Sequence, residues 1–321
     1  MPERPKIPRE TKHIVRRRCG FACVECGYPI FEYHHWPPYA ETRAHDDADL
    51  VLLCRNHHGE AGSTLFPPAA VLAAKANPFA LRHGASSAYA TRFAGNRCAI
   101  ELGGDNAFFG DLLPGESLSV VEMFGETLLA FSVESETLLL TLRLYDRADT
   151  LRLWIEENEL AFRSDNYDVE WIRNRVVVRT APRRVALEIT LAPPSQVAVP
   201  RAMFWKHGCF IRVTPRGIVN PSRCVISSSR IGGAGKGIVV VDEDFPGFSR
   251  DEPRLPFCCF ALPRHLRPEF FTWAVDPTDD EDQVDAEPPR GAGDPAVVDQ
   301  SFSSCPCGSG KSFATCHGAE N

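Results

Sequence analysis

The chain has 321 residues, of which 24% are charged, and a formal net charge of −7. No apolar run approaches the roughly 18 residues of a transmembrane helix, and the N-terminal segment lacks the apolar core of a secretory signal. We therefore expect a cytoplasmic protein with no membrane partner, in which close cysteines bind metal rather than form disulfides. This length predicts about two or three domains.

The negative charge is local. Residues 276–299 carry nine Asp or Glu against one Arg, which leaves the rest of the chain close to neutral. Residues 1–18 carry seven Lys or Arg against two Glu. A basic arm beside a metal site suits the phosphate backbone of DNA, and Arg16, Arg17 and Arg18 are the expected contacts. The alternative is a solvated, frayed terminus.

The first 82 residues predict a small domain. A short helix or extended arm is expected over 10–18, then a tight C-x-x-C turn at 23–26, with Gly27 supplying a permissive backbone. Residues 31–35 favour a strand, and residues 50–53 favour either a strand or the lead-in to a helix. A helix with proline at its start and its end is expected over 67–78.

The remaining chain predicts an α+β protein with most of its strands in one region. Residues 83–97 are expected to be a linker, and 98–262 a mainly antiparallel β domain of unknown role, because short β-type runs alternate with turn residues. A sandwich, a barrel and a β-solenoid all fit this pattern. The acidic, Pro/Gly-rich stretch 263–300 predicts a disordered linker, followed by a compact cysteine cluster at 301–321.

Two ligand pairs in the first domain are separated by 27 intervening residues. Cys23 and Cys26 form one pair, and Cys54 and His57 form the other. Together they supply four ligands, enough to close a tetrahedral Zn²⁺ site of structural type. His34, His35 and His58 remain beyond this set as candidates for chemistry.

The stretch resembles the HNH endonuclease family, whose core is a ββα-metal finger. The resemblance covers about residues 9–82 and rests on C-x-x-C-G at 23–27, His34-His35-Trp36 before Pro38, Asp49 before a Leu-rich run, and C-x-x-H-H at 54–58.

The resemblance implies a role for each matched residue. His35 would be the general base that takes a proton from the attacking water, and His34 and His58 would hold one catalytic Mg²⁺ or Mn²⁺. Asp49 would brace the loop that carries the base, although the family usually has Asn there. DNA is the implied substrate. By family analogy, the setting is bacterial defence against foreign DNA.

The chain also departs from the family after His58, where G-E-A-G-S-T lacks the basic residue of many members. An adaptor without catalytic activity, which binds nucleic acid or protein through the zinc finger, is the alternative function. His13 and His45 match no motif position and are expected to be ordinary loop histidines. Cys19 is expected to be a small buried residue.

The C-terminal cluster resembles the SEC-C motif, a short zinc knuckle at the ends of many unrelated bacterial proteins. The match is C-P-C-G-S-G-K-S-F-x-x-C-H-G. It implies a second Zn²⁺ on Cys305, Cys307, Cys316 and His317, and a role in docking a protein partner. A knuckle this small has no hydrophobic core, so the metal must supply its folding energy.

Overall fold

The structure is a computed structural model of the 321-residue chain. It describes residues 5–63, 65–113, 115–161, 168–172, 174–193, 195–220, 225–232 and 234–242, and the backbone of 256–262. The predicted linker at 263–300 and the predicted knuckle at 301–321 lie outside the described residues. None of the helices in the described part of the chain is long and apolar enough to cross a membrane.

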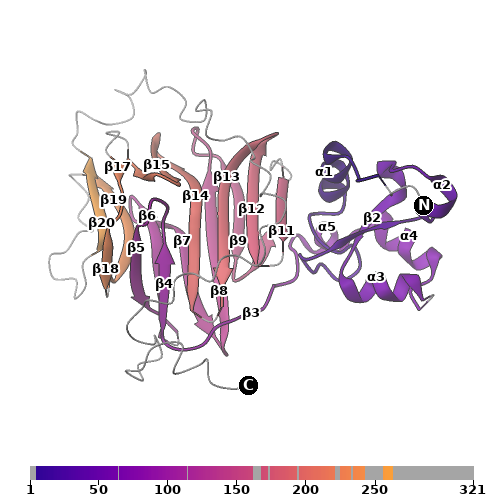
Figure 1. Ribbon diagram of the computed structural model, residues 1–321, viewed down its shortest axis with the longest axis horizontal. Helices are drawn as coiled ribbons and strands as arrows, with labels where there is room; N and C mark the ends of the chain where they lie inside the picture. Colours follow the sequence, from indigo (N-terminus) through magenta and orange to yellow (C-terminus); the bar gives the residue numbers. More distant parts are fainter. Residues whose placement is uncertain are drawn as a thin grey trace.

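The N-terminal domain is a small group of helices around one hairpin (Figure 1). Its elements are α1 (Arg9–Arg18), β1 (Glu32–His35), α2 (Tyr39–Thr42), the short 3₁₀ helix η1 (Asp47–Asp49), β2 (Leu50–Leu53), α3 (Arg55–Gly62), α4 (Pro68–Ala76) and α5 (Phe79–His83). The predicted strands and the predicted proline-bounded helix are confirmed.

The β1–β2 hairpin contributes to the hydrophobic core of this domain. β1 and β2 are antiparallel, with His34 opposite Val51 and His35 opposite Leu50. All four residues of β2 are buried, as an uninterrupted apolar run predicts for a strand covered on both faces. They pack with Val15, Cys19 and Phe66 in a small core of their own. The prediction that Cys19 is buried is confirmed.

Two large sheets form the rest of the described chain. The eight-stranded sheet contains β3 (Thr91–Arg92), β6 (Ser117–Met123), β7 (Glu126–Glu134), β8 (Thr137–Tyr145), β9 (Leu151–Glu156), β10 (Glu159–Ala161), β19 (Lys236–Asp242) and β20 (Pro256–Leu262). The ten-stranded sheet contains β4 (Arg97–Glu101), β5 (Ala107–Asp111), β11 (Asp168–Ile172), β12 (Arg175–Ala181), β13 (Arg184–Ala192), β14 (Gln196–Lys206), β15 (Cys209–Thr214), β16 (Gly217–Val219), β17 (Val225–Ile226) and β18 (Arg230–Gly232).

Both sheets contribute side chains to one hydrophobic core. Phe131 of β7 and Leu140 of β8 join Phe204 of β14 and Val178 of β12 in the same buried cluster. Most strand pairs are antiparallel, so the predicted α+β class with a mainly antiparallel β region is confirmed. Of the three architectures that the sequence allowed, two sheets over a shared core are a β-sandwich.

The two domains are packed together. Phe21 of the N-terminal domain is 2% exposed and belongs to the core of the sandwich. Tyr28 contacts Tyr89 edge to face, and Tyr89 contacts Trp171 of β11. The segment 83–97, expected to be a linker, contains strand β3 and the buried Phe93. Its apolar side chains anchor it to the sandwich.

A buried ion-pair network joins α1 to β11. Arg16 is 5% exposed, and its guanidinium donates to both carboxylate oxygens of Asp168 at 2.6 and 2.7 Å. Arg16 also contacts Glu170 at 2.7 Å and donates to the hydroxyl of Tyr33 at 2.6 Å. Burial opposes the charge, but hydrogen bonding to Asp168 raises the pKa of Arg16. This finding corrects the prediction that Arg16 contacts nucleic acid, because its donors serve the domain interface.

Candidate active site and metal centre

The four predicted zinc ligands lie together. Cys23 and Cys26 come from the turn before β1, which the bond from Gly27 N to Cys23 O closes at 2.8 Å. Cys54 immediately precedes α3, and His57 lies in its first turn. The three Sγ atoms and one imidazole nitrogen all lie within 4.8 Å of one another. Sequence spacing alone was enough to identify this group.

The distances fit a tetrahedral zinc ion. Zn–S and Zn–N bonds of about 2.3 and 2.05 Å require S···S edges of about 3.8 Å and S···N edges of about 3.5 Å. Cys26 Sγ lies 3.8 Å from Cys54 Sγ. His57 Nδ1 lies 3.5 Å from Cys23 Sγ and 3.3 Å from Cys54 Sγ. The four residues therefore fit Zn²⁺, with Nδ1 as the histidine donor.

The surroundings of the cluster favour bound metal. The outer nitrogen of His57, Nε2, lies 4.0 Å from a carboxylate oxygen of Glu60. A carboxylate on the far nitrogen is the usual partner of a metal-bound imidazole. Hydrogen bonding between the two thiols lowers the pKa of Cys23 and raises the pKa of Cys26. A lowered pKa favours the thiolate, which is the form that binds metal.

His34 and His58 face each other beside this centre. The two rings are 5.0 Å apart and nearly perpendicular, one from β1 and the other from α3. Burial, and then the neighbouring His58, lower the pKa of His34. A neutral imidazole is the form that binds a cation. The sequence predicted these two as partners, and the fold brings them together.

Glu32 is a functional candidate that the sequence reading missed. It lies two residues before His34 on the same face of β1. One of its carboxylate oxygens lies 3.5 Å from His58 Nδ1. The sequence signal for Glu32 was its spacing of two residues from His34, which places both on one face of a strand. Only the folded hairpin shows that α3 lies against that face.

His35 lies at the end of β1 and contacts a second histidine. His35 is 7% exposed, and its Nε2 lies 2.9 Å from His45 Nδ1. His45 Nε2 in turn lies 2.7 Å from the carbonyl oxygen of Pro5. His45 lies in a loop, as predicted, but it is not an isolated histidine, because it contacts His35. The prediction that His13 lies in a loop is wrong, because His13 is buried in α1.

This chain of bonds determines the tautomers of both rings. A carbonyl oxygen only accepts hydrogen bonds, so His45 Nε2 carries a proton and neutral His45 accepts at Nδ1. His35 must then donate from Nε2. In neutral His35 the lone pair is therefore on Nδ1.

The backbone of Asp49 is hydrogen-bonded to the backbone of Trp36, the residue after His35. The carbonyl of Asp49 accepts a hydrogen bond from Trp36 N at 2.7 Å. The carbonyl of Ala48 accepts one from the ammonium of Lys75 in α4. The main chain of η1 therefore stabilises the turn after β1. The family resemblance had predicted this role for the side chain of Asp49.

The arginines of the basic arm differ in their surroundings. Arg17 is exposed on α1. Arg18 pairs with the carboxylate of Asp47 at 3.2 Å and donates to the carbonyl of Leu50 at 2.9 Å. Asp168 and Glu170 of β11 form ion pairs with Arg16, and Glu170 also pairs with Arg179.

Comparison with known proteins identifies one short region. Residues 303–319 match the family model of the SEC-C motif. The chain therefore carries a SEC-C motif at its C-terminal end, where Cys305, Cys307, Cys316 and His317 lie outside the described residues. No curated protein and no solved structure matches the chain.

Proposed function

We propose that the N-terminal domain is a metal-dependent endonuclease of the HNH type that hydrolyses phosphodiester bonds in DNA. The observation that carries this proposal is the meeting of His34 and His58, 5.0 Å apart, on a β1–β2–α3 unit closed by three cysteines and a histidine. A purely structural finger needs only the four zinc ligands. The additional histidines on the adjoining surface are what a catalytic site requires.

The chemistry assigns a proton transfer to His35. Neutral His35 accepts a proton from water at Nδ1, the water oxygen forms a bond to phosphorus, and the bond from phosphorus to the leaving ester oxygen breaks. One product carries the phosphate and the other a hydroxyl after the leaving oxygen takes up a proton. His45 is a positioning residue, because its Nδ1 accepts a hydrogen bond from Nε2–H of His35 and so keeps the lone pair of His35 on Nδ1.

His34 and His58 are the residues that would hold a divalent cation, Mg²⁺ or Mn²⁺. When bound, such a cation polarises the phosphate and stabilises charge on the leaving oxygen. A carboxylate oxygen of Glu32 lies 3.5 Å from His58 Nδ1 and adds negative charge that favours a cation there. The zinc centre has a separate, structural role in fixing α3 against the hairpin.

We propose that a second Zn²⁺ binds Cys305, Cys307, Cys316 and His317 in the SEC-C motif, and that this knuckle docks a protein partner. The matched motif at 303–319 supports this proposal. Defence of a bacterial cell against foreign DNA is the setting proposed for the whole protein.

A zinc-finger adaptor that binds nucleic acid or protein without cutting is the second candidate. The form that binds a protein partner is favoured by the ion pairs of Arg16 with Asp168 and of Arg18 with Asp47, which leave fewer cations of α1 for a phosphate backbone. The two candidates differ in their need for His34, His35 and His58, since an adaptor needs none of the three.

The test is nicking of supercoiled plasmid by the full-length protein with Mg²⁺ or Mn²⁺. We expect wild type to convert supercoiled DNA to the open circle with either ion, and His35→Ala to lose this activity. His83→Ala is the matched control, because His83 is exposed on α5 outside the site. DNA binding without nicking under any metal would refute the nuclease and favour the adaptor.

A further inference from the structure

Trp36 lies immediately after His35 and continues the β1–β2 hairpin. Its N–H donates to the carbonyl of Asp49 at 2.7 Å, one position beyond the last register pair, His35 opposite Leu50. Because side chains alternate along a strand, Trp36 projects from the face that carries His34, about 7 Å farther along. The indole ring therefore borders the proposed cation site.

Trp36 differs from the other tryptophans in the described part of the chain. Each of the others has a ring contact or a hydrogen bond within the protein: Trp154, Trp171 and Trp205. The indole of Trp36 makes neither with any described residue, and it is not part of the core of its domain. It is also partly exposed to solvent. Tryptophan rings are usually highly buried, so a partly exposed ring with no partner is available to a ligand.

Arg55 adds a cation to the same surface. It is exposed in the first turn of α3, and it lies three residues before His58, so the two side chains are neighbours on the helix. None of the ion pairs between described residues involves Arg55. A guanidinium at this place can hold the phosphate next to one bound at His34 and His58. The surface therefore combines a ring for a base with a cation for a phosphate.

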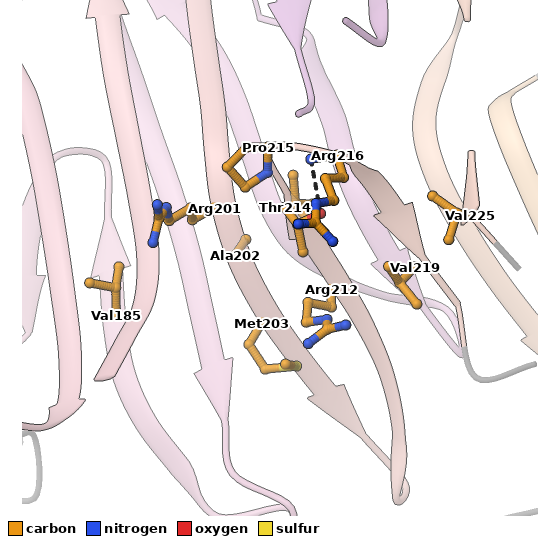
Figure 2. A pocket seen from close by; sticks show the side chains of 11 residues that line it. Val185, Arg201, Ala202, Met203, Arg212, Thr214, Pro215, Arg216, Val219 and Val225 are labelled. Atoms are coloured by element: carbon orange, nitrogen blue, oxygen red, sulfur yellow. Dashed lines mark hydrogen bonds between the residues drawn. The ribbon is translucent and has the colours of Figure 1, made fainter. Parts of the chain in front are cut away.

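A pocket on the ten-stranded sheet has neither of these features (Figure 2). It encloses about 300 Å³, and no aromatic residue lines it. Its three arginines, Arg201, Arg212 and Arg216, each already interact with another group of the protein. The surface beside His34 is thus better suited to nucleic acid than this pocket.

We propose that Trp36 is a stacking platform for an unpaired base, and that the site takes single-stranded DNA. This inference deepens the proposed nuclease site and rests on DNA being its ligand. An aromatic side chain stacks on the face of any base and strengthens single-strand binding about 5- to 150-fold per base. In a duplex the same contact requires a base step to be unstacked, which costs free energy.

The charges of the N-terminal domain favour the same conclusion. Arg16 and Arg18 are paired with carboxylates of the protein, so little of the basic arm serves a duplex backbone. Binding of duplex DNA depends chiefly on cations that neutralise phosphates. Stacking on Trp36 therefore supplies a larger share of the affinity than charge does.

Fluorescence anisotropy of the full-length protein, without added Mg²⁺ or Mn²⁺, measures binding separately from cleavage. The probes are a short labelled single strand of mixed sequence and the duplex that it forms with its complement, at one salt concentration. We expect the single strand to bind at least about 10-fold more tightly than the duplex.

Variants assign this preference to Trp36. Trp36→Leu should weaken single-strand binding at least about 5-fold and leave duplex binding within about twofold of wild type. Trp36→Phe keeps an aromatic ring and should retain most of the single-strand affinity. Trp154→Leu, partly exposed on β9 of the sandwich, is the matched control and should bind both probes as wild type does.

Four results would overturn the proposal: no binding of the single strand, duplex binding as tight as single-strand binding, an equal loss of both in Trp36→Leu, or equal affinities of Trp36→Leu and Trp154→Leu. Failure of wild type to nick plasmid, with the single-strand preference and its dependence on Trp36 intact, would refute the nuclease and uphold the stacking surface.

Discussion

Removal of the Asp168 charge should destabilise the protein because it leaves a buried cation underpaired. Asp168 holds Arg16 with two hydrogen bonds at 2.6 and 2.7 Å, and both side chains are nearly inaccessible. Loss of one partner from a buried pair costs about 3–5 kcal/mol. Because Glu170 still contacts Arg16 at 2.7 Å, we expect Asp168→Asn to cost about 3 kcal/mol, at the lower limit. This loss lowers the ratio of folded to unfolded protein roughly 100-fold.

Urea unfolding followed by tryptophan fluorescence measures this loss. Trp171 lies on β11 three residues after Asp168 and is 4% exposed, so the domain interface contributes to the emission of the five tryptophans. Glu156→Gln is the matched control, because it removes the charge from a partly exposed pair with Arg143 at 3.2 Å. Such pairs contribute less than about 1 kcal/mol. If the two variants differed by less than about 1 kcal/mol, the buried network would not hold the domains together as argued.

Three further changes test the site and its support. Cys54→Ser should abolish retention of zinc by the N-terminal domain, seen by elemental analysis, and lower the unfolding temperature, because metal binding supplies folding energy; full zinc content would contradict the assigned ligands. His45→Ala should slow plasmid nicking without changing the Mn²⁺ concentration required, and His45→Asn, which keeps an acceptor for His35 Nε2, should restore part of the rate; equal rates in all three proteins would contradict the tautomer argument. Gly27→Ala places a Cβ 2.2 Å from Phe79 at φ +73°, and should cost at least about 1–3 kcal/mol in urea unfolding.

The zinc centre could be predicted from sequence because its information is local. Two ligand pairs, each within four residues, and a turn glycine specify the geometry before any long-range contact is known. The same holds for β2, whose four apolar residues have no polar face, and for α4 between its prolines.

The contacts that were missed join residues far apart in the chain. Arg16 and Asp168 are separated by 152 residues. Taken alone in the sequence, neither residue differs from a charged residue that is exposed to solvent. His45 has no motif position, and only the loop after β1 returns it to His35. Local patterns predict strands well but carry little information on which strands pair, so the sandwich could not be chosen over a barrel.

The single-turnover rate of DNA cleavage by His35→Ala, relative to wild type in the same divalent cation, tests the central claim most directly. A general base contributes about 10²–10⁴-fold, so we predict a loss of that size, with His83→Ala at the wild-type rate. A His35→Ala rate within about threefold of wild type would contradict the assignment of His35 as the base and, with it, the proposed site.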